Sequence, residues 1–153
     1  MGVSGCGKTT VGTLLAEKIG GAFLDADDLH PASNIDRMKR GAPLTDEDRI
    51  PWLDRVAAAI RGRDPSRPLV VACSALKQAY RERLGRENFR LVHLTGPSPL
   101  IAERMKARPA HHMPVSLLES QFRDLEEPAD ALTVSVAGTP EDIVREIERA
   151  LCG

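Results

Sequence analysis

Residues 2–9 read GVSGCGKT and fit the pattern GxxxxGK[ST] at every fixed position. Glycines in such a loop let successive backbone N–H groups point at phosphate oxygens, and the following helix adds its dipole. Lys8 supplies a positive charge for the outer phosphates of ATP, and the Thr9 hydroxyl is suited to Mg²⁺. A chance match in a Gly-rich turn is the alternative. The other residues expected to contact the nucleotide are Gly2, Ser4, Gly5, Cys6, Gly7 and Thr10.

Short apolar runs alternate with longer amphipathic segments along the rest of the chain. Brief runs rich in Val, Leu or Phe predict strands at residues 22–26, 68–74, 89–96 and 132–138. Longer segments predict helices at residues 8–21, 45–63, 74–86, 98–108, 115–127 and 139–153, the second of them with Thr45 as its N-cap. This alternation predicts an α/β fold with a parallel sheet covered by helices on both faces. Ligands of such sheets gather at the carboxyl ends of the strands.

Composition narrows the class of protein. A chain of 153 residues fits one domain, and its net charge of −1 gives no sign of a nucleic-acid or membrane-surface partner. Its three cysteines, Cys6, Cys73 and Cys152, form no CxxC pair, so neither a disulfide framework nor a zinc site is indicated. No apolar run approaches the roughly 18 residues of a membrane span. We therefore expect a protein of the reducing cytoplasm that acts on small molecules.

A second polar cluster lies in residues 23–31, FLDADDLHP, where a predicted strand ends. Asp25 and Asp27 are two residues apart, so their carboxylates point the same way if the backbone is extended. One is then placed to hold a Mg²⁺-bound water while the other accepts a proton from a substrate hydroxyl. The alternative is that Asp25, Asp27 and Asp28 merely cap the helix that follows.

Two pairs of basic residues are spaced four residues apart. Lys77 and Arg81 share one face of a predicted helix, where they are placed to bind a carboxylate or phosphate. A solvated basic face is the alternative. Arg104 and Arg108 lie at the end of another predicted helix. Arginines at the edge of a mobile segment are suited to closing over phosphoryl oxygens, or they serve only as favourable cations at a helix C-terminus.

Five segments together resemble the gluconate kinase family of P-loop small-molecule kinases, over a stretch from Gly2 to about Pro128. They are GVSGCGKTT, FLDADDLHP, NIDRMKRGAPLTDEDRIPWL, CSALKQAYRERL and LLESQFRDLEEP. The first alone indicates only a nucleoside triphosphate, whereas the next three in this order are specific to the family. The resemblance implies a three-layer, NMP-kinase-like fold in a single domain over residues 1–153, with a lid-like segment at about 104–128.

The same resemblance implies transfer of the γ-phosphoryl group of ATP to the 6-hydroxyl of D-gluconate. By family analogy Lys8 and Thr9 serve ATP and Mg²⁺, Asp25 contacts the metal, and Asp27 is the preferred base. The family also favours a homodimer. The remaining residues are implied at two places: His30, Arg49, Lys77 and Arg81 at the gluconate carboxylate and hydroxyls, and Arg104 and Arg108 in the lid, where one neutralises phosphate charge.

Two features depart from the family pattern. A Gly-His-Phe-like stretch normally follows the lid arginine, whereas residues 109–114 read PAHHMP. In the family a strand of about five apolar residues leads into the loop, but here only Met1 precedes Gly2. We expect that Met1 is an internal methionine or that the chain was truncated, so that the first strand, which belongs in the middle of the sheet, is missing. The 153-residue chain should then contain an open apolar slot and be unstable or insoluble unless another segment fills the gap.

Two other functions stay open on the sequence. One is a different small-molecule kinase, such as a shikimate-like or nucleoside kinase, although a nucleoside site favours stacking aromatics and the chain has few: one Trp, one Tyr and three Phe. The other is a catalytically inactive regulator that binds ATP without turnover that depends on a sugar acid.

Overall fold

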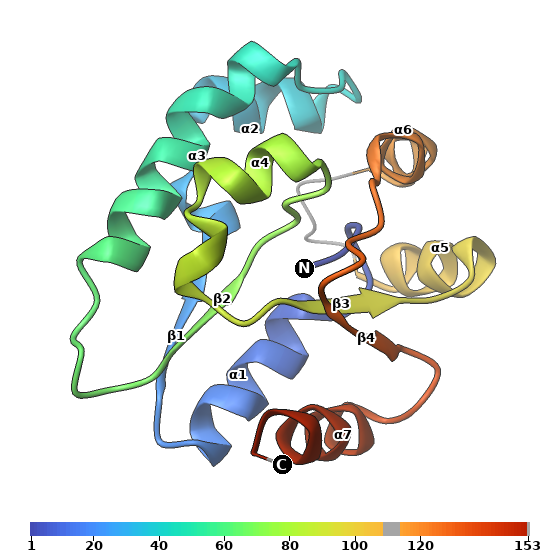
Figure 1. Cartoon of the computed structure of the whole chain (residues 1–153). Helices are drawn as coiled ribbons and strands as arrows, with labels where there is room; N and C mark the ends of the chain where they lie inside the picture. Colours follow the sequence, from blue (N-terminus) through green and yellow to red (C-terminus); the bar gives the residue numbers. More distant parts are fainter. Residues whose placement is uncertain (109–113, 153) are drawn as a thin grey trace.

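The computed structural model describes residues 1–108 and 114–152. Its strands are β1 (Ala22–Asp25), β2 (Leu69–Ala72), β3 (Val92–Thr95) and β4 (Leu132–Ser135). Its α-helices are α1 (Lys8–Lys18), α2 (Ala32–Lys39), α3 (Asp46–Arg61), α4 (Gln78–Arg83), α5 (Ser98–Lys106), α6 (Leu118–Asp124) and α7 (Pro140–Cys152). Short 3₁₀ helices are η1 (Ala26–Leu29), η2 (Arg86–Asn88) and η3 (Val115–Leu117). Figure 1 shows α1 and α7 on one side of the strands and α3 and α4 on the other, which confirms the predicted α/β fold.

The N-cap of α3 follows the sequence prediction. The Thr45 hydroxyl accepts a hydrogen bond from the Asp48 N–H, and the Asp48 carboxylate accepts one from the Thr45 N–H. This reciprocal capping box satisfies two N–H groups that have no partner inside the helix. The capping box thus fixes the start of α3 at Asp46.

Most predicted elements are longer than those in the structure, as two of them illustrate. The helix predicted at 74–86 begins only at Gln78, because the chain before it turns through Ala75, whose φ of 43° is left-handed. The strand predicted at 89–96 spans only Val92–Thr95, because Phe89 still caps η2 (Arg86–Asn88) and pairing with β4 begins at Val92. Helix α2 lies outside the helix ranges predicted from the sequence.

All strand pairing is parallel, in two separate two-stranded sheets within the described residues. In the first sheet β1 pairs with β2, so that Asp25 lies opposite Ala72 at the carboxyl end. In the second sheet β3 pairs with β4, and Thr95 lies opposite Ser135. The core is divided accordingly. One apolar cluster packs α1, α5 and α7 around β3 and β4, and the other packs α3 and α4 near β1 and β2.

An apolar slot separates the two sheets, and Met1 and Gly2 cross it at one end. The Leu94 N–H donates to the Met1 carbonyl (2.9 Å), and the Gly2 N–H donates to the Ser74 carbonyl (3.3 Å). These two residues thus bridge β3 and the segment after β2. A cavity of about 290 Å³ extends from Met1 between β2 and β3 and is lined mainly by apolar side chains, among them Val11, Leu15, Val70 and Val92. The structure therefore has the open apolar slot that the sequence predicts.

We expect the free energy of unfolding of the 153-residue chain to rise between pH 6 and pH 8. The Met1 amino group donates to the Val92 carbonyl, and its burial lowers its pKa from 8.0 to about 6. In this window the unfolded chain binds more protons than the folded chain, so stability rises with pH and is lower by about 3 kcal/mol below pH 6. Burial also lowers the pKa of His93 from 6.5, with the same sign in a lower window. Urea titrations across this range measure the effect.

The matched control is a chain extended by about five apolar residues ahead of Met1. The extension removes the charged amine from the slot and supplies backbone groups for β2 and β3. We expect the extended chain to be more stable and to lose the rise between pH 6.5 and 8. An equal rise in both chains, or no rise in the shorter one, would contradict the expectation.

Candidate functional site

The glycine loop, residues 2–7, leads directly into α1, as the sequence pattern predicts. Gly5 has a φ of +79° and Gly7 a φ of +96°, both in the left-handed region that strains other residues. A Cβ on Gly5 would also lie 2.4 Å from the Met105 Cγ atom, so α5 packs against the bare backbone. The loop thus holds its shape at two positions through the absence of a side chain.

Lys8 folds back over this loop. Its Nζ atom donates to the carbonyls of Gly2 and Val3, each at 2.9 Å. The free N–H groups of the first turn of α1 lie beside it, so two sources of positive potential meet at one place. The Ser4 N–H donates to the Oε1 atom of Gln121 at 2.6 Å, which ties α6 to the loop. Gln121 is not among the predicted site residues, because a polar residue inside a helical pattern carries no signal of its own.

The two residues predicted to serve a metal lie in contact. The Thr9 hydroxyl donates to Asp25 Oδ2 at 2.7 Å, and Asp25 Oδ1 accepts from the Asp27 N–H at 3.0 Å. Hydroxyl and carboxylate oxygens suit Mg²⁺, which in nucleotide sites usually keeps waters and phosphate ligands and needs only one or two carboxylates. No cluster of three His, Cys, Asp or Glu side chains forms a metal site in residues 1–108 and 114–152. The donor set present fits a metal shared with phosphates.

The predicted parallel orientation of Asp25 and Asp27 is wrong. Asp25 ends β1, but Asp27 lies in the 3₁₀ helix η1, so the backbone between them is not extended. Asp25 also caps η1, as the alternative interpretation holds, while its second oxygen contacts Thr9. The Asp27 residue instead lines a pocket with Lys8 and His30. Although the two residues are close in the chain, Asp25 contacts Thr9 whereas Asp27 lines the pocket.

This polar pocket brings together residues from six parts of the chain. It has a volume of about 40 Å³ and is much smaller than the slot between the sheets, which is larger but offers few polar groups. We therefore take the smaller cavity as the candidate site, because polar and charged side chains line it. Its polar lining comes from the loop, η1, α3, the segment after β2, α4 and α6: Ser4, Lys8, Asp27, His30, Arg49, Ser74, Tyr80 and Gln121.

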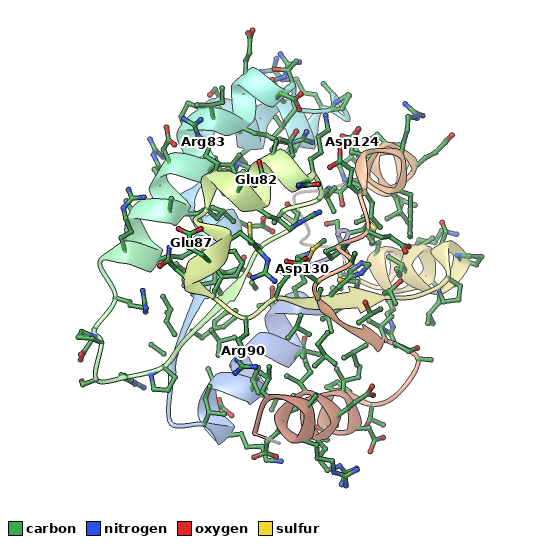
Figure 2. The ribbon with its side chains drawn as sticks, viewed as in Figure 1. Glu82, Arg83, Glu87, Arg90, Asp124 and Asp130 are labelled. Atoms are coloured by element: carbon green, nitrogen blue, oxygen red, sulfur yellow. The ribbon has the colours of Figure 1, made fainter. Side chains whose placement is uncertain are left out.

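Arg49 and Lys77 meet over Tyr80 at the edge of the pocket. Arg49 Nη1 donates to the Tyr80 hydroxyl at 2.9 Å, and Lys77 Nζ donates to Asp46 Oδ1 at 2.9 Å. Both cations lie over the Tyr80 ring, at 5.4 and 5.6 Å from its centroid. Asp124, the last residue of α6, lies between α6 and α4 in Figure 2 and is 3.6 Å from Arg49. Two cations thus lie over one phenol, whose hydroxyl contacts Asp46, and Asp124 lies beside Arg49.

The charge states of this group follow from its contacts. The Tyr80 hydroxyl donates to Asp46, and this bond, with the contact from Lys77, lowers the pKa of that carboxyl. The bond to Asp46 raises the pKa of Lys77, while burial, followed by the Asp46 carboxylate, raises the pKa of Tyr80. At neutral pH the aspartate and the lysine are therefore charged and the phenol is neutral. Tyr80 was not predicted as a site residue, since its position in a helical pattern is equally consistent with core packing.

The structure does not bring Arg81 to the pocket. Lys77 is extended and precedes α4, so the predicted pairing of Lys77 and Arg81 on one helix face is wrong. Arg81 is buried, and its Nη1 atom donates to the carbonyls of Ala75 (3.0 Å) and Leu76 (2.9 Å). Its side chain lines the slot beside Met1. Arg81 therefore supports the turn before α4.

The two predicted lid arginines lie in different surroundings. Helix α5 ends at Lys106, two residues earlier than predicted, so Arg108 lies beyond it. Arg108 Nη2 donates to the Thr10 hydroxyl at 3.3 Å, next to the glycine loop. Arg104 Nη2 donates to the Val136 carbonyl at 2.7 Å. Residues 109–113, part of the predicted lid and most of its departure from the family pattern, lie outside the described residues.

Comparisons with known proteins agree with this arrangement. A family model described as Shikimate kinase matches residues 4–152. The chain is 46% identical over 131 residues to the thermosensitive gluconokinase of Escherichia coli (strain K12), covering 84% of this chain and 70% of that protein. It is 41% identical over 155 residues to the gluconokinase of Gluconobacter oxydans (strain 621H), covering 97% and 87%.

A solved structure supports the same relationship. The crystal structure of a gluconokinase from Sinorhizobium meliloti 1021 superposes with a TM-score of 0.87 at 44% identity, covering 99% of this chain and 89% of that one. Among the described residues, no helix has the length and apolar character that a membrane span requires. The chain therefore belongs to the gluconokinase family of P-loop kinases, whose domain the shikimate kinase model also describes.

Proposed function

We propose that this protein is a gluconokinase that transfers the γ-phosphoryl group of ATP to the 6-hydroxyl of D-gluconate. The observation that carries the proposal is the lining of one pocket by Lys8 from the phosphate loop, Asp27 and Arg49. These supply a cation for phosphate, a carboxylate for a hydroxyl proton and a cation for an acid. The names and identities of the relatives support the choice of acceptor.

The phosphate end of the site relies on positioning and charge. In the proposed complex the loop N–H groups and Lys8 bind the β- and γ-phosphates, and Lys8 exchanges its bonds to the Gly2 and Val3 carbonyls for phosphate oxygens. Mg²⁺, held by Thr9 and Asp25, would neutralise phosphate charge. Arg108, bonded to Thr10, is close enough to the loop to add a further cation. Arg104 is bonded to the Val136 carbonyl and has to leave it before it serves the phosphates.

Asp27 is the proposed general base. It lies in the same pocket as Lys8, which places a proton acceptor near the phosphate loop. The carboxylate takes the proton from the 6-hydroxyl as its O–H bond breaks and the new O–P bond forms. The bond between the γ-phosphorus and its bridging oxygen breaks in the same displacement, and ADP leaves with that electron pair. The later loss of the proton from Asp27 restores the enzyme.

Arg49 and Lys77 form the proposed site for the gluconate carboxylate. In the structure each is balanced by an aspartate, and the Arg49 contacts to Asp46 (3.9 Å) and Asp124 (3.6 Å) are long for ion pairs. A substrate carboxylate at bidentate distance would replace these weaker contacts. The Tyr80 hydroxyl accepts from the same Nη1 atom of Arg49 at 2.9 Å and thereby helps to fix the position of the guanidinium.

Replacing Arg49 with methionine should raise the KM for gluconate by about 10- to 100-fold, because a charge-assisted hydrogen bond to the acid is lost. The KM for ATP and the kcat at saturating gluconate should change much less. Steady-state kinetics with each substrate varied in turn measure the difference. Arg61→Met, an exposed site on the same helix, is the matched control. Equal effects on both KM values would argue against a carboxylate site at Arg49.

Two further properties belong to the proposal. The described cysteines, Cys6 and Cys73, are buried free thiols, which supports function in the reducing cytoplasm. Burial raises the pKa of Cys73 to about 12, so this thiol is inert at neutral pH.

A homodimer stays a prediction, and sedimentation of the purified protein over a range of concentrations tests it.

The experiment is an assay of ADP release from Mg²⁺-ATP with D-gluconate, with shikimate and with no acceptor. Release that depends on gluconate is the expected result. Release that depends on shikimate would assign the site to a different kinase, and ATP binding with no acceptor-dependent release would indicate the inactive regulator. The chain extended ahead of Met1 is assayed in parallel, because instability of the shorter chain would otherwise resemble inactivity.

A further inference from the structure

A buried asparagine contacts His30 from behind the pocket. Asn34 on α2 is 3% exposed, and its Nδ2 atom lies 2.9 Å from the Asp48 carbonyl oxygen and 3.3 Å from His30 Nδ1. His30 lies between η1 and α2 and lines the pocket with Asp27 and Lys8. Neither the family resemblance nor the motif pattern assigns a role to Asn34.

The contacts of Asn34 determine which nitrogen of His30 carries the proton. A carbonyl oxygen only accepts, so the Asn34 atom that faces Asp48 must be the amide nitrogen. That nitrogen has a second hydrogen, and His30 Nδ1 lies within hydrogen-bond distance of it, at 3.3 Å. A neutral imidazole accepts at one ring nitrogen and donates at the other. Since Nδ1 accepts from Asn34, the proton of the neutral ring lies on Nε2.

Trp52 fixes the plane of the same imidazole. The two rings are stacked with centroids 4.1 Å apart and an interplanar angle of 13°. Trp52 is itself fully buried, and its Nε1 atom donates to the Ala26 carbonyl at 2.7 Å. The ring of His30 is thus constrained in its plane by Trp52 and in its tautomer by Asn34.

We propose that Asn34 is a positioning residue that makes His30 a fixed hydrogen-bond donor, through Nε2–H, to an oxygen of the acceptor substrate. The identity of that substrate as a sugar acid rests on the function proposed above. Hydroxyl and carboxylate oxygens of such an acid both accept this bond. A group at the same place that only donates, such as an ammonium, would face the Nε2 proton and be rejected. His30 would therefore select for oxygen acceptors at this position.

The first test observes the tautomer without any substrate. The ¹⁵N spectrum of protein labelled at the histidine rings distinguishes a protonated from an unprotonated ring nitrogen, and His30 is assigned by its loss in His30→Gln. At pH 9, well above the ordinary imidazole pKa of about 6.5, we expect the proton on Nε2. A proton on Nδ1 would overturn the proposal whatever reaction the protein catalyses.

The second test reverses the contact with Asn34→Asp, because a carboxylate accepts from Nδ1 and moves the proton away from Nε2. At pH 9 we expect the KM for gluconate to rise about tenfold, with the KM for ATP unchanged. Asn88→Asp, an exposed site in η2, is the matched control and should leave both KM values unchanged. An unchanged gluconate KM in folded Asn34→Asp protein, despite a reversed tautomer, would show that His30 does not donate to the substrate.

A double variant separates positioning from folding. The amide of His30→Gln carries its own N–H donors, so its hydrogen-bonding role no longer depends on a tautomer. Adding Asn34→Asp to His30→Gln should then change the gluconate KM by less than about twofold, whereas independent effects would multiply. Full multiplication would show that Asn34 acts only on the fold. If the wild type showed no gluconate-dependent turnover at all, the proposed function would fail while the tautomer measurement still stood.

Discussion

Replacing Lys8 with methionine is expected to lower the kcat of gluconate-dependent ADP release by about 10²–10³. The Lys8 Nζ atom lies on the glycine loop within hydrogen-bond distance of the Gly2 and Val3 carbonyls, where the outer phosphates of ATP are expected. Methionine keeps the length of the side chain and removes the charge, so negative charge that builds on the phosphates loses its nearest fixed cation. Steady-state kinetics at saturating gluconate measure the loss.

The matched control for Lys8 is Lys18→Met, ten residues further along the chain at the other end of α1. Lys18 is exposed and pairs with Glu148 at 2.7 Å, far in the fold from the loop. Its replacement should change kcat by less than about twofold, as surface pairs contribute little. Thermal unfolding of both variants shows whether the loop tolerates the change. A Lys8→Met protein that is folded and retains more than a third of wild-type kcat would contradict the assigned role.

Replacing Asp27 with asparagine is expected to lower kcat by about 10²–10⁴, because the amide cannot accept the hydroxyl proton. The KM values for ATP and gluconate should change only a few-fold, since shape is retained. Asp28→Asn, an exposed neighbour in the same 3₁₀ helix, is the control and should leave kcat nearly unchanged.

Asp25→Asn separates the two neighbouring carboxylates. Asp25 contacts the Thr9 hydroxyl, whereas Asp27 lines the pocket. The Asp25 variant should therefore need a higher Mg²⁺ concentration for half-maximal rate, and Asp27→Asn should keep the wild-type requirement. If the two variants exchanged these properties, Asp25 would be the base and Asp27 the metal ligand.

The glycine loop and the acidic cluster were predictable from sequence because their function depends on local backbone geometry. Fixed spacing in residues 2–9 sets both the left-handed turns and the position of Lys8. Similarly, Asp25 follows a short apolar run, and parallel strands bring their carboxyl ends to one edge. The contact between Thr9 and Asp25 follows from these two local facts.

Residues that act through long-range contacts were not predictable in the same way. The spacing of Lys77 and Arg81 is helical, but the left-handed Ala75 delays the helix, and the Ala75 and Leu76 carbonyls capture the Arg81 guanidinium. Asn34 and Tyr80 owe their places to partners on α3 that are 14 and 31 residues away. Periodicity indicates which face a residue shares with its neighbours, and it does not indicate which element that face will meet.

The apolar slot between the sheets is expected to lower the free energy of unfolding. Met1 and Gly2 satisfy backbone groups at one end, while the apolar walls from β2, β3 and α1 surround a cavity of about 290 Å³. Cavities of this kind cost stability because their walls lose packing partners. The carboxyl ends of the strands, where the polar pocket lies, are the part that Met1 and Gly2 hold together.

The position of the transferred phosphate tests the proposed reaction most directly. Uniformly ¹³C-labelled D-gluconate is incubated with Mg²⁺-ATP and the protein, and the product is examined for ³¹P–¹³C coupling. Coupling of phosphorus through oxygen to C6, with one ADP formed for each phosphorylated acid, is the expected result. Phosphate on a different carbon, or ADP formed without any phosphorylated gluconate, would contradict transfer to the 6-hydroxyl.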